Sequence, residues 1–233
     1  MTEELFREDA TLLGCDATVV GQGEGGVTLD RTVCYPLGGG QAGDTGWLVS
    51  REQRWRIADT RKSKESPGAI VHLIDGEPPA VGTPVRVEVD APRRQAHRRF
   101  HTATHLLCAL LPYPVDGCSI TETYARLDFH TDQPFDKDAL QAGLDRLVAE
   151  AHPVGHRWIS EEELDANPGL VRSMSVQPPR GPGWVRVLEI NGVDLQPCGG
   201  THVSNTAEIG AVVVTKIEKK SAMTRRVVLG FAG

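Results

Sequence analysis

Two short stretches of the sequence each carry a pair of metal-binding side chains at four-residue spacing. His101-Thr-Ala-Thr-His105 supplies two imidazoles, and Cys198-Gly-Gly-Thr-His202 supplies a thiol and a third imidazole. Residues at positions i and i+4 of a helix lie on one face, so His101 and His105 can point at one ion. The two glycines after Cys198 let the chain bend tightly enough to return His202 to the same point. Zinc accepts this mixture of nitrogen and sulfur in tetrahedral geometry, so the sequence predicts one Zn²⁺ per chain.

One further histidine, His97, is an alternative metal ligand. His97 lies four residues before His101 and could replace a ligand, but its arginine neighbours favour a role facing phosphate. We interpret the remaining histidines and cysteines as structural residues, because isolated ones are more often hydrogen-bonded or packed than ligating. These are His72, His130, His152, His156, Cys15, Cys34, Cys108 and Cys118.

The charge distribution indicates a polyanion near the metal motif rather than a protein that coats nucleic acid. The formal net charge is −6 over 233 residues, which argues against binding through bulk electrostatics. Basic residues nevertheless crowd the histidine pair and the C-terminal end, although such runs are often only solvated faces. We expect RNA contacts from Arg93, Arg94, Arg98, Arg99, Lys219, Lys220, Arg225 and Arg226.

The elements that would position these residues divide into two parts. Residues 1–89 alternate short β-favouring runs with glycine and proline, which predicts a small β-barrel. The runs lie at 17–20, 27–29, 46–49, 55–57, 69–74 and 85–89. At Asp90-Ala-Pro92 an N-cap candidate and an early proline predict a helix up to Leu111. We therefore expect a glycine-rich barrel domain over 1–89 and a second domain over 90–233.

The second part has the pattern of an α+β domain. We expect a helix over 136–151 and a short helix from Ser160, where Glu163 completes a capping box. Strands are predicted at 123–129, 184–190, 211–217 and 226–229, and segment 184–190 alternates as if one face were covered. The fold class is thus α+β, a small N-terminal β-barrel followed by a largely antiparallel sheet with flanking helices.

Two glycine patterns match a dinucleotide-binding string without its context. Both Gly21–Gly26 and Gly38–Gly43 satisfy GxGxxG, but the first is followed by a strand signal and no helix follows the second. We expect segment 38–41 to be either a flexible loop or a loop whose bare backbone lets another molecule approach, with Gln41 as an amide donor and acceptor.

The composition indicates the compartment. No apolar run reaches the length of a membrane span, and the N-terminus is acidic rather than signal-like. The chain has 5 cysteines, an odd number with one in a ligand motif, which favours a reducing compartment. We expect a cytoplasmic protein without a membrane partner, and the sequence does not indicate its oligomeric state.

The two paired motifs carry a family resemblance. With Arg126-Leu-Asp-Phe129 between them and Tyr35-Pro-Leu-Gly-Gly-Gly-Gln-Ala-Gly-Asp-Thr-Gly46 before them, they resemble the editing domain of alanyl-tRNA synthetases. The chain is more closely similar to the free-standing AlaX editing proteins of medium length, over nearly its whole length and in order. It has no counterpart of the aminoacylation domain.

The resemblance implies an ATP-independent, zinc-containing hydrolase that acts on the acceptor end of alanine tRNA. It would hydrolyse the ester of a wrong amino acid, serine or glycine, and residues 90–233 would form the editing domain. The catalytic residues would be Thr104, which helps to select the side chain, and Cys198. Substrate contacts would come from Thr201 and, through the barrel domain, from Gly38, Gly39, Gly40 and Gln41.

The sequence leaves several alternatives open. Four protein ligands form a closed shell that is typical of structural zinc, whereas catalytic zinc keeps one position open. Either one ligand is loose, the coordination expands to five, or the metal organises the pocket while its neighbours position water.

The synthetases carry a Gln-Lys-Gly-Ser-like turn where this chain reads Val115-Asp-Gly-Cys118, so the choice between serine and glycine stays open. The other interpretations are a non-catalytic, zinc-stabilised tRNA-binding module and a deacylase for another mischarged tRNA.

Overall fold

The computed structural model describes residues 1–51, 53–174, 181 and 183–232. It divides into two compact units, Met1–Gln95 and Ala96–Gly233. Helix α1 (Ala91–Leu110) contributes its first turn to unit 1 and its remainder to unit 2. The predicted start of this helix is confirmed, because the Asp90 carboxylate accepts a hydrogen bond from the backbone N–H of Arg93.

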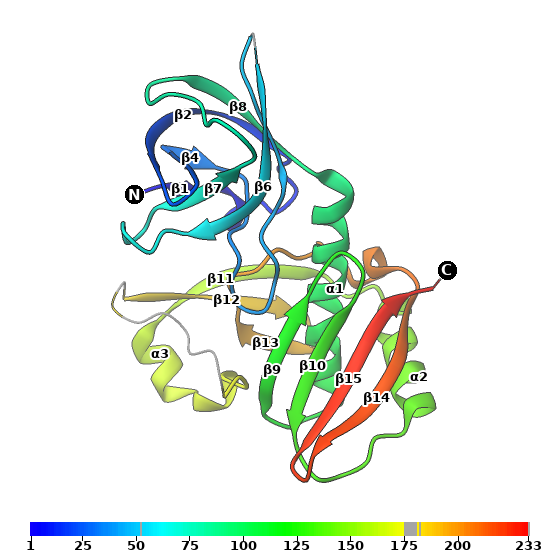
Figure 1. Ribbon diagram of the computed structural model, residues 1–233. Coiled ribbons are helices and arrows are strands. Elements are labelled where there is room, and N and C mark those ends of the chain that lie inside the picture. Colours follow the sequence, from blue (N-terminus) through cyan, green and yellow to red (C-terminus); the bar gives the residue numbers. More distant parts are fainter. Residues whose placement is uncertain (52, 175–180, 182, 233) are drawn as a thin grey trace. The chain divides into compact units, whose positions relative to one another are not determined.

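Unit 1 is a closed six-stranded barrel, as the β-favouring runs predict (Figure 1). Its strands follow one another around the barrel in the order β2 (Gly14–Gly23), β3 (Gly26–Leu29), β7 (Ile70–Ile74), β6 (Arg54–Lys62), β5 (Gly46–Val49) and β8 (Pro84–Val89). A short parallel pair, β1 (Glu3–Glu4) and β4 (Arg31–Thr32), and the 3₁₀ turn η1 (Leu5–Arg7) complete the unit. Apolar side chains such as Val27, Leu48 and Ile57 fill the barrel core. The Gly21–Gly26 string leads into strand β3, so no dinucleotide-binding helix follows it.

Unit 2 contains two antiparallel sheets, where the sequence predicts one. The larger has the order β14 (Val212–Ser221), β15 (Thr224–Phe231), β10 (Ala125–His130) and β9 (Val115–Ile120). The smaller has the order β11 (Val154–Ser160), β12 (Trp184–Ile190) and β13 (Asp194–Pro197). The predicted α+β class with antiparallel pairing is confirmed, and only the number of sheets differs, because β9, β11 and β13 carry too many polar and glycine residues to show a clear period.

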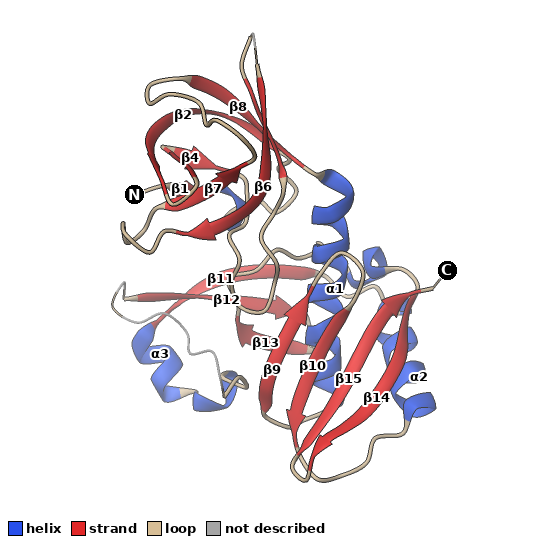
Figure 2. Cartoon of the chain, viewed as in Figure 1, coloured by secondary structure: helices blue, strands red, loops and turns tan. Residues whose placement is uncertain are grey.

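The helices of unit 2 cover the sheets as separate layers. Helices α1 and α2 (Lys137–Ala149) lie along the larger sheet (Figure 2). They share one apolar core with it, in which Phe100, Leu107 and Leu144 are fully buried. Helix α3 (Glu161–Ala166) packs on β11 and β12 with the 3₁₀ turn η2 (Pro168–Leu170) beside it. The cap predicted at Ser160 is present, and the helix expected from residue 136 is capped by the Asp136 side chain, which sequence analysis did not identify as a cap. A further 3₁₀ turn, η3 (Thr206–Ile209), precedes β14.

Strand β12 departs from the expected one-sided pattern. Val185, Arg186, Val187 and Leu188 are all buried, so both faces of the strand are covered at its centre. One face packs on α3 through Val185 and Val187. On the other face lies Arg186, whose guanidinium reaches the loop after β13. Among the described residues, no helix is long and apolar enough to cross a membrane.

Candidate metal centre

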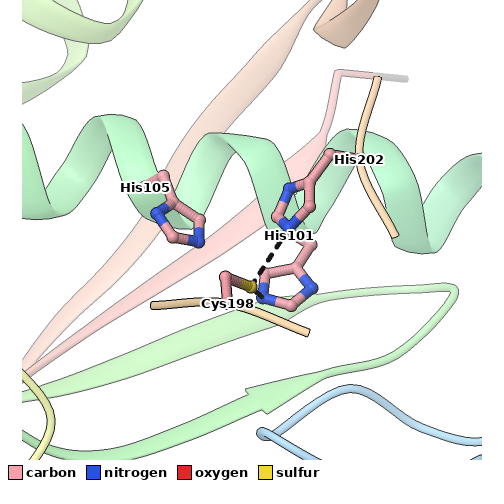
Figure 3. A group of neighbouring side chains, drawn as sticks. All are labelled: His101, His105, Cys198 and His202. Carbon is pink, nitrogen blue, oxygen red and sulfur yellow. Dashed lines mark hydrogen bonds between the residues drawn. The ribbon is translucent and has the colours of Figure 1, made fainter. Parts of the chain in front are cut away.

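The four predicted ligands meet at one point in unit 2. His101, His105, Cys198 and His202 each offer one ligating atom, and these atoms all lie within 4.8 Å of one another. Cys198 Sγ is 3.2 Å from His202 Nε2 and 3.5 Å from His101 Nε2 (Figure 3). The three imidazoles are buried, whereas Cys198 is half-buried.

Helix α1 presents the two histidines on one side, as their spacing predicts. The rings of His101 and His105 have centroids 5.6 Å apart, as expected for successive turns of one face. The buried apolar side chains of the helix, Phe100, Ala103 and Leu107, anchor the neighbouring face in the core. This packing fixes the rotation of the helix and therefore the direction of both imidazoles.

Two arginines hold the Cys198–His202 loop against the helix and the smaller sheet. Arg98 donates from Nε to the carbonyl oxygen of His202 at 2.7 Å. Arg186 donates from Nη1 to the carbonyl oxygens of Cys198, at 2.8 Å, and Gly200, at 3.4 Å. The backbone N–H of Gly200 donates to Cys198 Sγ at 3.4 Å. These contacts fix the loop through its backbone and leave the ligating side chains facing inward.

The electrostatics of the cluster favour a thiolate at Cys198 beside a protonated His105, which gives up a proton when a metal binds. Burial would raise the pKa of the Cys198 thiol, but the neighbouring charges of His101 and His202 and hydrogen bonds hold it well below its usual value. Burial would lower the pKa of His105, but hydrogen bonds to Asp194 and Cys198 raise it to about 10. Burial lowers the pKa of His202, and the charge on His101 adds to this effect. A thiolate is the form of cysteine that binds metal.

The residues fit a zinc ion. Three imidazole nitrogens and one thiolate are the ligand types that zinc prefers in four-coordinate sites. Bond lengths of about 2.0–2.3 Å place tetrahedral ligands roughly 3.3–3.8 Å apart, so the most separated ligand atoms, which lie up to 4.8 Å apart, would have to close by about 1 Å around an ion. The cluster does not include His97, the alternative ligand, which is buried with Nε2 3.9 Å from Glu122 Oε2.

The predicted catalytic and substrate-binding threonines lie beside the ligands in sequence and are buried. Thr104 is 4% exposed and donates its hydroxyl hydrogen to the carbonyl oxygen of His101 at 2.7 Å. Its oxygen keeps lone pairs with which it can accept a further hydrogen bond. Thr201 is fully buried between Gly200 and His202. Their roles toward a substrate stay predictions.

The glycine-rich segment of unit 1 forms a tight turn rather than an open loop. The backbones of Gly38 and Gln41 exchange hydrogen bonds of 3.1 and 3.0 Å. Gly39 and Gly40 have φ values of 57° and 83°, which side chains other than glycine rarely adopt. The Tyr35 hydroxyl donates to the carbonyl oxygen of Gly38 at 2.8 Å, and Gln41 is buried. The role expected for this segment toward a substrate stays a prediction.

The arginines at the start of α1 have different environments. Arg94 is 1% exposed, pairs with Asp44 and donates to the carbonyl oxygen of Val33. Arg98 is also buried. Arg93 and Arg99 are half-buried, and Arg99 lies over the Phe231 ring at 4.0 Å. All four arginines donate to groups inside the protein, Arg93 to the Gly43 carbonyl and Arg99 to the Ile209 carbonyl, but only the half-buried pair is also accessible to solvent.

The C-terminal cations also differ from one another. Lys219 and Lys220 are exposed on β14. Arg226 donates to both oxygens of Asp128, from Nε at 2.7 Å and from Nη2 at 2.9 Å. Arg225 is buried and donates to the carbonyl oxygens of Ser221 and Asp132. The exposed lysines are therefore the most accessible of these four residues to a polyanion.

Sequence reasoning missed the residues that surround the ligands. Asp194 and Gln196 lie on β13, and Asp194 accepts a hydrogen bond from His105 Nδ1 at 2.8 Å. Thr102 contacts His202 Nδ1 at 3.2 Å. Asp194 precedes Cys198 by four residues and Thr102 lies inside the histidine motif, but nothing in that spacing identifies their partners.

Comparison with known proteins gives two matching family models. The model for the second additional domain of threonyl and alanyl tRNA synthetases matches residues 185–228. The model for class II (A) tRNA synthetases matches residues 12–93. The alanyl-tRNA editing protein AlaX-M of Saccharolobus solfataricus is 35% identical, over 97% of this chain and 98% of that protein. AlaX-M of Methanosarcina barkeri is 33% identical over 97% of both chains. The alanine–tRNA ligase of Archaeoglobus fulgidus is 31% identical over 93% of this chain but only 24% of the ligase.

Proposed function

The chain belongs to the family of alanyl-tRNA editing proteins, and from this premise we propose that it is a cytoplasmic trans-editing hydrolase that deacylates alanine tRNA mischarged with serine or glycine. The observation that carries this proposal is the convergence of His101, His105, Cys198 and His202 in a chain that matches AlaX-M proteins over nearly its full length.

We propose that the four residues hold one zinc ion in the editing pocket. Zinc bound there polarises a carbonyl oxygen or lowers the pKa of a water molecule, either of which suits ester hydrolysis. Cys198 is the half-buried member of the set, while the three imidazoles are buried. We therefore propose that the ester reaches the cluster beside Cys198.

The threonines beside the ligands supply the selection of the amino acid. The Thr104 hydroxyl hydrogen is used on the His101 carbonyl, so its oxygen accepts a hydrogen bond from the serine hydroxyl or the α-ammonium. Thr201 has the same role on the opposite motif. Serine can pair with the Thr104 oxygen through its hydroxyl, whereas alanine lacks that hydroxyl, which favours hydrolysis of serine-charged over correctly charged tRNA. This contact selects serine and does not explain release of glycine.

The barrel domain contributes to specificity through Gln41 and the glycines before it. The turn at Gly38–Gln41 is held by backbone hydrogen bonds and by Tyr35, so the segment presents a defined backbone surface. We propose that this surface and the Gln41 amide contact the mischarged end, with bare glycine backbone allowing close approach.

The tRNA is held mainly through its phosphates. Lys219, Lys220 and the half-buried Arg93 and Arg99 supply cations that remain accessible. Phosphate contacts are independent of sequence, so these residues would set affinity and position the acceptor end. Arg94, Arg98, Arg225 and Arg226 belong to the same two clusters, and their contacts with RNA would come in addition to their internal bonds.

A panel of charged tRNAs tests the proposed function. Serine-, glycine- and alanine-charged alanine tRNA, and a threonine-type mischarged tRNA, are incubated with excess wild-type protein under single-turnover conditions. We expect rapid release of serine or glycine and no release of alanine. The Cys198→Ala variant should bind the tRNA without deacylating it.

Two other results of this panel would each support an alternative function. A protein that binds tRNA but leaves every ester intact is the zinc-stabilised binding module that the closed ligand set also allows. Release of threonine from its tRNA, with serine-charged alanine tRNA untouched, would assign the deacylase to another mischarged substrate.

A further inference from the structure

We propose that Asp194 is a positioning residue of the metal centre, which fixes the tautomer of His105 and directs the free ring nitrogen of that residue at the ion. This inference rests on the zinc-containing pocket of the proposed function. It concerns a carboxylate on β13 that is not one of the four ligands and lies 89 residues away from His105 in the sequence.

The geometry of the pair determines where the imidazole hydrogen resides. Asp194 Oδ2 lies 2.8 Å from His105 Nδ1, and the two side chains are 1% and 8% exposed. An ionised carboxylate only accepts hydrogen bonds, so Nδ1 must carry the hydrogen. In the neutral imidazole, which is the form that binds a metal, Nδ1 then carries the only N–H, and Nε2 offers its lone pair to the ion.

The carboxylate is itself held in place by a neighbour on the same strand. Gln196 Nε2 donates to both oxygens of Asp194, at 2.8 and 2.9 Å. Gln196 is 8% exposed, so water competes little for these bonds. Asp194 therefore has a fixed orientation toward His105, and its negative charge makes the imidazole a better electron donor to a metal.

His202 shows the same arrangement with a different partner. Thr102 donates its single hydroxyl hydrogen to the carbonyl oxygen of Arg98 at 2.9 Å and accepts from the backbone N–H of Val203 at 3.2 Å. Its contact of 3.2 Å with His202 Nδ1 must then use a hydrogen on that nitrogen. His202 Nε2, the atom nearest Cys198 Sγ, is left free to ligate.

Two of the three imidazoles are thus prepared for metal binding by groups outside the ligand set. Such outer contacts on histidine ligands orient the ring and increase its affinity for the ion. The pattern extends the site from four residues to a connected set that also contains Asp194, Gln196 and Thr102.

Zinc affinity of Asp194→Asn tests the inference without any tRNA. Competition with a chromophoric chelator should give an affinity about 10–100-fold below that of the wild type. Asp116→Asn is the matched control, because Asp116 Oδ2 lies 3.1 Å from His130 Nδ1 in the same unit but outside the cluster. It should leave zinc affinity unchanged.

A spectroscopic measurement separates positioning from a purely structural role. Long-range ¹H–¹⁵N correlation spectra of the zinc-loaded protein report which nitrogen of each histidine carries the hydrogen. The wild type and Asp116→Asn should show His105 with hydrogen on Nδ1, and Asp194→Asn should lose this signature. A residue that acted only on stability would change urea unfolding but would change neither the zinc affinity nor the ring nitrogen of His105 that carries the hydrogen.

If Asp194→Asn does not fold, the pair Thr102→Val and Thr102→Ser replaces it. The inference then predicts weaker zinc binding for the valine variant and recovery in the serine variant, which keeps the hydroxyl. Unchanged affinity and tautomer in Asp194→Asn, or in Thr102→Val where that variant is used, would overturn this inference alone. A folded wild-type protein without zinc affinity would overturn it together with the zinc-containing pocket.

Discussion

The guanidinium of Arg98 donates a hydrogen bond to the carbonyl oxygen of His202 at 2.7 Å, which links the helix motif to the loop motif. Both residues are buried. The two halves of the ligand set come from segments about a hundred residues apart, so their alignment depends on such contacts. Arg98 therefore has a structural task next to the metal centre, and its contact with RNA stays a prediction.

Replacement of Arg98 by alanine should loosen the metal site. Removal of a charged hydrogen bond to a buried carbonyl is expected to lower the free energy of unfolding by about 1.5–3 kcal/mol. Bound zinc should also dissociate faster. Urea unfolding and chelator-induced zinc release measure both effects.

Arg146→Ala is the control for this variant, because Arg146 forms an exposed pair with Glu150 one helical turn away. The expected cost is below about 0.5 kcal/mol. Equal stability of the two variants would show that the Arg98 contact does not hold the loop.

The barrel contains a buried ion pair that should dominate the stability of unit 1. Arg94 is 1% exposed, and Asp44, its partner, is fully buried and also accepts from the Tyr35 backbone N–H at 2.6 Å. Arg94→Met should destabilise the unit by about 3–5 kcal/mol, because it leaves a buried carboxylate without its partner. Hydrogen exchange of the barrel strands measures this destabilisation.

A double variant distinguishes this role from a contact with RNA. Addition of Asp44→Asn to Arg94→Met should recover part of the stability, since the uncompensated charge is removed. A variant with wild-type stability but weaker tRNA binding would contradict the structural role and support the RNA contact.

His72 should make the stability of the barrel depend on pH. Its Nδ1 donates to the Val27 carbonyl at 3.4 Å and its Nε2 contacts the Thr32 hydroxyl at 2.8 Å, with no exposed surface. Burial lowers the pKa of His72 from its ordinary 6.5 to about 4. The unfolded chain therefore binds a proton at a higher pH than the folded one. The stabilisation is complete above pH 6.5 and declines as the pH falls toward 4.

Urea unfolding at about pH 7.5 and about pH 5 measures this contribution. We expect the pH-dependent decrease in stability to be smaller by about 2 kcal/mol in His72→Gln than in the wild type. His152→Gln, which changes a histidine paired with exposed Glu150, serves as the control. Identical pH dependence in wild type and His72→Gln would show that His72 is not the titrating group.

The C-terminal lysines should affect tRNA affinity without affecting chemistry. Combined replacement of Lys219 and Lys220 by alanine removes two exposed cations. Binding should weaken equally for charged and uncharged tRNA. The slope of log affinity against log salt should fall by about 0.7–0.9 for each phosphate that the lysines no longer neutralise. Filter binding over a range of salt measures the slope.

The deacylation rate at saturating protein should stay unchanged in this variant. Replacement of two exposed cations on α2, Lys137 and Arg146, provides the charge-matched control. It should change neither the salt dependence of tRNA binding nor the deacylation rate. A salt slope equal to that of the wild type would remove the lysines from the RNA interface.

The two metal-binding motifs, each taken by itself, and the barrel could be predicted from sequence because they are local patterns. The four-residue spacing of His101 and His105 needs only a helix, and the Asp90 cap with Pro92 identifies where that helix starts. The barrel strands are runs of branched residues between glycines. The cap at Ser160 likewise uses a neighbour within three residues, the backbone N–H of Glu163.

The remaining features depend on contacts between distant segments. The sequence of strand β9, Val115-Asp-Gly-Cys-Ser-Ile120, resembles a turn because it contains Asp-Gly and only its two end residues are buried. It forms a strand because it pairs with β10. Strand β12 loses its expected alternation because Arg186 is buried on its second face, where it holds the Cys198 carbonyl. The partnership of Asp194 and His105 spans 89 residues and requires the pairing of β13 with β12.

The most direct measurement is serine release from serine-charged alanine tRNA as zinc is returned to metal-stripped protein. We predict that activity rises with added zinc and saturates at about one equivalent per chain. At saturation, serine should be released at least about 100-fold faster than alanine. Full activity in the stripped protein, or intact serine ester at saturating zinc with the tRNA still bound, would contradict a zinc-containing editing pocket.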